Sequence, residues 1–201
     1  MDDLARLVGE RLRAARRERG LSVGGLAEAA GVGKGSLSEI ENGTRNPTLS
    51  TLYSLAGALR MPLATLLAEH AGATVASPGI EARLLDVSHD DGHTVEVYRL
   101  RLHPGLTHRS GSHGSGVTEY LLVTAGHARA GREGAEADIG PGQSATWLSD
   151  GPHTYLALGT ATVESVLVIR TPGADRLRPS SSAHPGPVRP VGTPVGLPGW
   201  R

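Results

Sequence analysis

The chain of 201 residues is long enough for one large domain or two small ones. It contains no cysteine, which excludes disulfides, thiolate metal ligands and cysteine nucleophiles. No apolar run approaches the roughly 18–20 residues of a membrane span, and the start at Asp2 and Asp3 lacks the basic flank of a signal peptide. We therefore expect a cytoplasmic protein with no membrane partner.

The formal net charge is zero, but the charges are unevenly distributed. Residues 1–72 carry 9 Lys or Arg against 8 Asp or Glu, residues 73–171 carry 7 against 11, and residues 172–201 carry 4 against 1. An acidic middle segment between two mildly basic ends indicates separate modules with separate partners.

Apolar residues recur at helical spacing up to about residue 70. Short breaks interrupt this pattern at residues 20–22, 31–33, 42–47 and 61–62. The breaks divide residues 1–70 into five short helices, which we expect to pack as one compact bundle.

From Ile80 the apolar period changes to two, and turn signals recur every 8–12 residues or so. This pattern is typical of an all-β sandwich or barrel, which we place at residues 80–171. The small residues of 71–79 predict a linker before it. Residues 172–201 hold 7 of the chain's 13 prolines and are predicted to be disordered.

The segment 26–40 has the residue pattern of a helix-turn-helix. The small Ala27 lies where two steeply crossing helices approach most closely, and Gly31 lies at the turn, where glycine readily adopts the required positive φ. Five further positions fall on the inward faces of the two helices: Leu26, Ala30, Val32, Leu37 and Ile40. Together these positions favour a DNA-binding unit over an ordinary helical hairpin.

The residues that follow resemble the Xre (phage-repressor-like) family. Residues 36–43 read Ser-Leu-Ser-Glu-Ile-Glu-Asn-Gly, and Asn46-Pro47 and Leu49 come next. The family's recognition helix ends in Ile-Glu-Asn-Gly, and its next helix opens after Asn-Pro. The resemblance implies a lambda-repressor-like domain whose recognition helix, from about Lys34 to Asn42, lies in the major groove.

The same resemblance implies a set of DNA-facing residues on this helix and beside it. They are Ser22, Val23, Lys34, Gly35, Ser36, Ser38, Glu39, Asn42, Thr44 and Arg45. Arg16 and Glu41 match a family pair that forms an internal salt bridge, so we expect both to be structural.

Two departures from the family weaken the expected DNA contacts. Gly24 and Gly25 stand where the family usually has Gln or Glu, which costs roughly 1 kcal/mol of helix stability at each position and removes the capping-box partner of Ser22. Gly33 and Gly35 leave the start of the recognition helix without side chains. We therefore expect a weakly binding monomer that depends on dimerisation and phosphate contacts.

Residues 80–171 resemble a cupin, a double-stranded β-helix or jelly-roll barrel. Glu119 is followed after six residues by Gly126, as in the family's first motif, and His113 stands at its first histidine. Ser115 occupies the second histidine position. The whole chain is thus expected to be an α+β multidomain protein, with a five-helix helix-turn-helix domain followed by an all-β cupin barrel.

The second cupin motif is looser. The turn at residues 140–142 and His153 match it, whereas Ala157 replaces an asparagine. The resemblance then implies that His113, Glu119 and His153 form a two-His-one-carboxylate group for Fe, Mn, Ni or Zn. His108 is an alternative ligand that the spacing does not favour.

A pocket that has lost its metal and binds a small organic ligand is the other interpretation of this site. The residues expected to line the pocket are His113, Ser115, Glu119, Tyr120, Trp147, His153 and Tyr155. The aromatic residues among them are equally compatible with a place in the core.

These features predict a sequence-specific transcriptional regulator rather than an enzyme. Its barrels would pair as a homodimer, present two recognition helices to a double-stranded operator, and bind a small-molecule effector. The alternative is a mononuclear metal-dependent cupin enzyme, resembling an epoxidase or dioxygenase, that carries the helical domain. A protein–protein module without DNA binding is a third interpretation, which the intact turn and Asn42-Gly43 disfavour.

Overall fold

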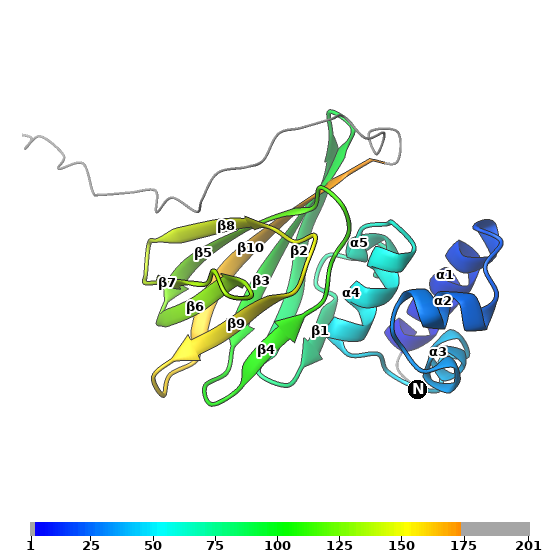
Figure 1. Cartoon of the computed structure of the whole chain (residues 1–201), viewed down its shortest axis with the longest axis horizontal. Helices are drawn as coiled ribbons and strands as arrows, with labels where there is room; N and C mark the ends of the chain where they lie inside the picture. Colours follow the sequence, from blue (N-terminus) through cyan, green and yellow to red (C-terminus); the bar gives the residue numbers. More distant parts are fainter. Residues whose placement is uncertain (1–2, 174–201) are drawn as a thin grey trace, which may run out of the picture.

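The computed structural model describes residues 3–173, which form a helical part and a β-sheet part (Figure 1). The helices are α1 (Asp3–Glu18), α2 (Val23–Ala29), α3 (Lys34–Glu41), α4 (Leu49–Ala58) and α5 (Leu63–Leu66). The five helices predicted from the apolar spacing are confirmed.

The helices pack around leucines that the helical period brings to one side of each. Leu12, Leu26, Leu37 and Leu52 are fully buried in this core. Helix α1 approaches α3 very closely at Gly9, where an added Cβ would collide with the carbonyl oxygen of Ile40. The contact between α1 and α3 therefore depends on the absence of a side chain at this position.

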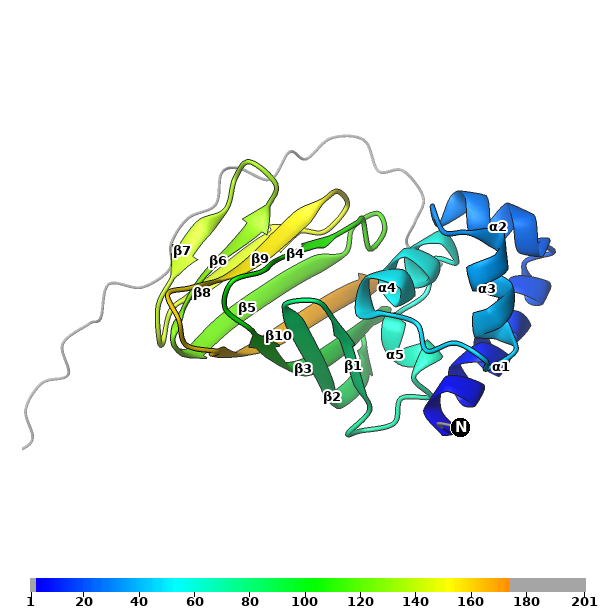
Figure 2. The same ribbon diagram turned by 90° about the horizontal axis from the view of Figure 1, so that it is seen from below.

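The β part consists of ten strands in two antiparallel sheets. The strands are β1 (Thr74–Ser77), β2 (Ile80–Asp90), β3 (His93–Leu102), β4 (Thr107–Ser110), β5 (Thr118–Ala125), β6 (His127–Arg132), β7 (Ala137–Ile139), β8 (Ser144–Leu148), β9 (His153–Leu158) and β10 (Val163–Pro172). One sheet has the order β1-β2-β3-β10-β5-β8 and the other β4-β9-β6-β7. The two sheets face each other as the predicted cupin barrel (Figure 2).

Side chains alternate between the interior and the outside of the barrel with the predicted period of two. Along β10, Val163, Leu167 and Ile169 are buried, whereas Val166 and Val168 between them are only half-buried. This alternation decides which residues can reach a site inside the barrel.

The stretch expected to be a linker contains a strand. Within residues 71–79, β1 pairs with β2 from Thr74 opposite Arg83 to Ser77 opposite Ile80. Val75 is the only buried side chain of β1, so the alternating apolar pattern that identifies a strand is almost missing here. The predicted disorder of residues 172–201 falls, from residue 174 onward, outside the described residues. No helix among residues 3–173 is long and apolar enough to cross a membrane.

Helices α4 and α5 lie between α1–α3 and the barrel (Figures 1 and 2). The backbone N–H of Ala64 donates to Glu96 Oε1 on β3 at 2.6 Å, and that of Ser50 donates to Ser77 Oγ on β1 at 3.1 Å. One continuous hydrophobic core runs from the helices into the barrel. The helical part is thus docked on the barrel rather than tethered to it.

Glu96 makes the stability of this docked structure depend on pH. Its carboxylate accepts hydrogen bonds from Ala64 N and Tyr98 OH, but burial outweighs them and raises its pKa from 4.5 to about 7. Between these values the folded protein retains a proton that the unfolded chain releases, so the free energy of unfolding falls as pH rises.

We predict that Glu96→Gln removes this pH-dependent fall in the free energy of unfolding, which amounts to at most about 3 kcal/mol. Urea unfolding should find the two proteins equally stable near about pH 4 and the variant more stable near about pH 8. A difference between them that does not change with pH would contradict the assignment.

Candidate nucleic-acid interface and metal centre

Helices α2 and α3 and the turn between them form a helix-turn-helix at one end of the molecule. Gly31 has a φ of +64°, the left-handed conformation predicted for the turn. Leu26, Ala27, Leu37 and Ile40 are all buried, as the pattern of inward positions predicts. Helix α3 begins at Lys34 and ends at Glu41.

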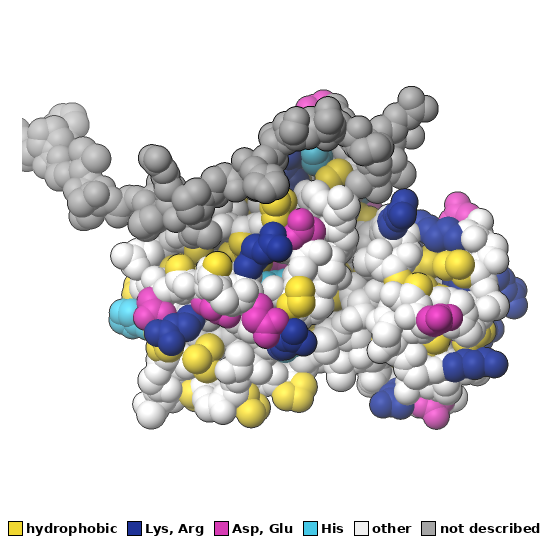
Figure 3. All heavy atoms as spheres, in the orientation of Figure 1, with side chains coloured by type: hydrophobic (Ala, Val, Ile, Leu, Met, Phe, Trp, Pro, Cys, Tyr) yellow, Lys and Arg dark blue, Asp and Glu magenta, His cyan; other side chains and the backbone are white. Residues whose placement is uncertain are grey.

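The residues expected to face DNA lie on α3, just after its C-terminal end and at the start of α2. All are exposed or half-buried: Ser22, Val23, Lys34, Gly35, Ser36, Ser38, Glu39, Asn42, Thr44 and Arg45. Several Lys and Arg side chains are spread over the surface of this part of the molecule (Figure 3). The structure therefore leaves this surface accessible.

A buried ion pair fixes the recognition helix to α1. Arg16 Nε lies 2.6 Å from Glu41 Oε1, and Arg16 Nη2 lies 2.7 Å from Glu41 Oε2. Arg13 Nη2 donates to the carbonyl oxygen of Glu41 at 2.8 Å and also to Asn42 Oδ1. The internal salt bridge implied by the family resemblance is confirmed, and it holds the C-terminal end of α3 in place.

Polar contacts on the outer side of α3 are exposed and therefore readily exchanged. Arg45 Nη1 donates to Ser36 Oγ at 3.0 Å and to Glu39 Oε2 at 3.2 Å.

At the start of α2, Ser22 Oγ still accepts a hydrogen bond from the backbone N–H of Gly25 at 3.0 Å, although the capping-box side chain is missing.

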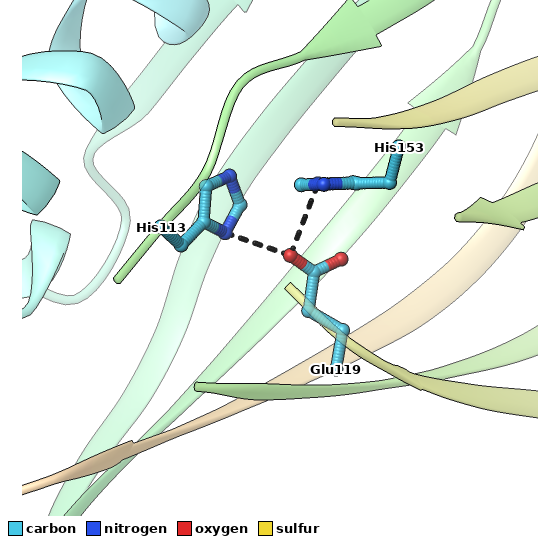
Figure 4. Close-up of side chains that lie close together, drawn as sticks. All are labelled: His113, Glu119 and His153. Atoms are coloured by element: carbon cyan, nitrogen blue, oxygen red, sulfur yellow. Dashed lines mark ion pairs between the residues drawn. The ribbon is translucent and has the colours of Figure 1, made fainter. Parts of the chain in front are cut away.

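Three candidate metal ligands from separate segments meet inside the barrel (Figure 4). His113 lies in the loop after β4, Glu119 on β5 and His153 at the start of β9. His113 Nδ1 lies 2.7 Å and His153 Nε2 lies 3.3 Å from Glu119 Oε1. All three residues are buried, and their ligand atoms lie within 4.8 Å of one another.

The electrostatics of this cluster favour a carboxylate anion at Glu119 and a neutral ring at His113, whereas the Glu119 carboxylate raises the pKa of His153 against the effect of burial. Burial opposes ionisation of Glu119, but His113 and His153 together hold its pKa well below the usual range. Burial lowers the pKa of His113, which favours the neutral ring that binds a metal. Glu119 Oε2 accepts a hydrogen bond from Tyr155 OH, so the other oxygen faces the histidines.

Buried polar atoms without a hydrogen bond of normal geometry are concentrated around this cluster. In residues 3–173 they are Tyr53 OH, His113 Nδ1 and Nε2, Glu119 Oε1, Trp147 Nε1, Ser149 Oγ and His153 Nε2. An unsatisfied buried polar group costs about 1–3 kcal/mol. Two imidazole nitrogens and a carboxylate oxygen that converge without good hydrogen bonds fit a divalent metal ion.

Of the other residues expected in or near the pocket, some lie beside the cluster and others lie outside it. Trp147 and Tyr155 are buried beside His153, with ring centroids 6.2 and 5.7 Å from its imidazole. Ser115 is exposed in the loop before β5. His108 is buried but is not part of the cluster. Its Nε2 lies 3.3 Å from Ser110 Oγ, and burial lowers its pKa to about 4.

Tyr120 requires a correction. It is 45% exposed on the outer face of β5, because a strand directs successive side chains to opposite faces and the neighbouring Glu119 points inward. Tyr120 therefore does not line the barrel site.

A residue of the helical part reaches the barrel site, and no sequence pattern pointed to it. The ring of Tyr53 on α4 stacks on the imidazole of His113, with centroids 3.8 Å apart and planes 12° apart. Tyr53 is buried, and burial together with the nearby carboxylates of Glu119 and Glu96 raises its pKa well above the usual value. Its position in α4 resembles that of an ordinary core residue, so only the docking of α4 on the barrel shows its partner.

Comparison with known proteins agrees with this two-part architecture. The Helix-turn-helix family model (HTH_3) matches residues 12–66. The HTH-type transcriptional regulator SutR of Escherichia coli (strain K12) is 30% identical over 176 residues, which cover 86% of this chain and 99% of that protein. The HTH-type transcriptional repressor RghR of Bacillus subtilis (strain 168) is 47% identical over 60 residues, which cover 29% of this chain and 44% of the repressor.

A crystal structure shows the same fold over most of the chain. An HTH_3 family transcriptional regulator from Vibrio cholerae superposes with a TM-score of 0.75 at 24% identity, covering 84% of this chain and 97% of the other.

Fold and relatives together define the class: a transcriptional regulator with a helix-turn-helix DNA-binding domain. The chain belongs to the Xre-family (HTH_3) regulators, and in it the helix-turn-helix domain is followed by a β-barrel.

The buried ion pair of the helix-turn-helix generates a stability prediction. Glu41→Gln leaves the buried Arg16 guanidinium without a counter-charge and should lower the free energy of unfolding by about 3 kcal/mol. The matched control is Arg6→Gln, because the Arg6–Glu10 pair is exposed and should contribute less than about 0.5 kcal/mol. Urea denaturation measures both, and equal losses in the two variants would contradict this ranking.

Proposed function

We propose that the protein binds a double-stranded operator as a homodimer joined through its barrels, and that the barrel holds a divalent metal and senses a small-molecule effector. The observation that carries this proposal is one continuous core that joins an accessible helix-turn-helix to an incompletely hydrogen-bonded two-His-one-carboxylate cluster. The proposed role is regulatory and not catalytic, in line with the names of the relatives.

The recognition surface supports base contacts by few side chains. Lys34, Ser36 and Ser38 are the residues of α3 that can donate to base edges in the major groove. Asn42, Thr44 and Arg45 would bind phosphates, Arg45 by exchanging its exposed contact with Glu39 for one with the DNA backbone. With so few base contacts, useful affinity requires a dimer.

We predict that Lys34→Ala abolishes operator binding without changing the fold. Genome-wide mapping of bound DNA would supply the operator, fluorescence anisotropy the affinity, and circular dichroism the check on folding. Arg129→Ala on β6 is the control, because this exposed arginine belongs to the barrel, where it pairs with Asp138. Retained sequence-specific binding by Lys34→Ala would contradict the placement of α3.

The barrel cluster supports metal binding by its donor set. His113, Glu119 and His153 offer two imidazoles and one carboxylate, the combination suited to Fe, Mn, Ni or Zn with coordination positions left open. Trp147, next to His153, provides a fluorescent reporter inside the barrel.

We predict about one equivalent of Ni²⁺ or Zn²⁺ bound to the wild type, and binding weaker by more than about tenfold in Glu119→Gln. His108→Ala should bind normally, because His108 lies outside the cluster. Elemental analysis measures the stoichiometry. Quenching of Trp147 fluorescence by Ni²⁺, in a Trp200→Phe background, measures the affinity. Wild-type stoichiometry in Glu119→Gln would contradict the site.

An apolar patch on the outside of the six-stranded sheet supports dimerisation. The patch, here called the outer patch, consists of Val97, Tyr120, Leu122, Val166 and Val168 on three adjacent strands. Tyr120 and Leu122 are 45% and 41% exposed. Such a patch on each copy can form a self-complementary two-fold interface.

We predict that Tyr120→Glu/Leu122→Glu converts the dimer to a monomer and weakens operator binding by at least about tenfold. Sedimentation equilibrium and anisotropy test this, with Leu106→Glu as control, since Leu106 is 52% exposed but lies outside the outer patch. A dimer that survives the double substitution would exclude this interface.

The stacking of Tyr53 on His113 can couple ligand binding in the barrel to the position of the DNA-binding helices. A metal that fixes the orientation of the His113 ring would also fix Tyr53 and with it α4. Helix α4 shares the buried core of α2 and α3, so occupancy of the barrel would change the free energy of operator binding.

A metal-dependent cupin enzyme is the second candidate, favoured by the same two-His-one-carboxylate cluster. Iron-loaded protein that turns over a substrate with consumption of oxygen would support it against the regulatory proposal.

A further inference from the structure

A cavity of about 370 Å³ lies between the helical part and the barrel. Gly57, Arg60 and Met61 line it from the helical side, and His113, Ser115 and Val117 are among the residues that line it from the barrel. The volume lies in the range of about 300–1,000 Å³ that is usual for small-molecule sites. His113 therefore belongs both to the metal cluster and to the wall of this cavity.

The charge of the cavity wall favours an anion. Arg60 is the only charged residue among those that line it, and no carboxylate does. The Arg60 side chain is exposed, and no salt bridge joins it to another residue between 3 and 173. A guanidinium without a counter-charge at the edge of a cavity can bind a carboxylate through two parallel hydrogen bonds.

The backbone of Arg60 is also strained. Its φ of +51° follows directly on the end of α4, in the left-handed conformation that favours glycine. This conformation costs roughly 1–2 kcal/mol for other residues. The chain therefore places an arginine at a position where glycine would be more stable.

The rest of the wall combines polar groups with a smaller apolar surface. At Gly57 an added Cβ would lie 3.0 Å from the carbonyl oxygen of Ser112, so α4 and the loop that carries His113 are in direct contact. Met61, Val117 and Pro172 provide apolar surface. A ligand that fits this wall has a negatively charged group for Arg60 and a short apolar body.

We propose that this cavity is the effector site and that it binds a small monocarboxylate with an apolar body, held between Arg60 and the barrel loop that carries His113. This inference rests on the proposed regulatory function and adds the place and the chemical class of the effector. A molecule that touches both parts stabilises their docked arrangement and contacts a ligand of the metal cluster.

The test is a titration of the ¹⁵N-labelled full chain, followed by NMR. The probes are hexanoate, its neutral analogue hexanamide and inorganic phosphate, and the reporters are the amide signals of the cavity residues Gly57 and Gly114. We expect hexanoate to shift both signals with a Kd in the millimolar range or below. Hexanamide and phosphate should bind at least about tenfold more weakly. Arg60→Gln should weaken hexanoate binding by a similar factor, whereas Arg17→Gln, which removes an exposed arginine on α1, should not.

Three results would overturn the inference: no shift with hexanoate, wild-type affinity in Arg60→Gln, or phosphate binding as tight as that of hexanoate. Operator binding by the same ligand-free sample separates this inference from the function on which it rests. A sample that binds its operator but not hexanoate refutes the effector site alone, and one that binds no operator refutes the regulatory function.

Discussion

The contact between α4 and the barrel loop around His113 determines how the two parts of this protein act on each other. Tyr53 stacks on His113, Gly57 lets the helix touch the loop backbone, and the hydrogen bond from Ala64 to Glu96 anchors α5 beside it. Because the core is continuous across this boundary, moving the helical part would expose apolar surface. The orientation of the recognition helix relative to the barrel is thus part of the fold, and a ligand at the boundary acts on both.

Two buried groups of charged or titratable side chains differ in how completely their polar atoms are hydrogen-bonded. Arg16 and Glu41 satisfy each other with two short hydrogen bonds, and this complete pairing suits a structural role. In the barrel, by contrast, His113, Glu119 and His153 approach one another with polar atoms left unsatisfied. A cluster that is costly when incomplete is stabilised by whatever completes it.

The fold and the site could be predicted where a residue pattern lies within one segment or matches a family motif. Residues from Leu26 to Ile40 pack mainly against one another, so their spacing predicted the helix-turn-helix. The convergence of His113, Glu119 and His153 followed from cupin motif positions.

Tyr53 could not be found this way, because its partner lies on the other side of a boundary between two modules. Tyr120 follows Glu119 directly in the sequence, but the alternation of strand β5 turns it to the opposite face. Strand β1 buries a single side chain, which leaves almost no pattern to detect.

The most direct test of this account is the operator affinity of wild type and Tyr53→Leu, each with and without Ni²⁺. The barrel ligands remain in the variant, so Ni²⁺ binding can be verified independently by elemental analysis. Ni²⁺ should change the operator affinity of the wild type and leave that of Tyr53→Leu unchanged. The same change in both proteins, or none in metal-loaded wild type, would contradict it.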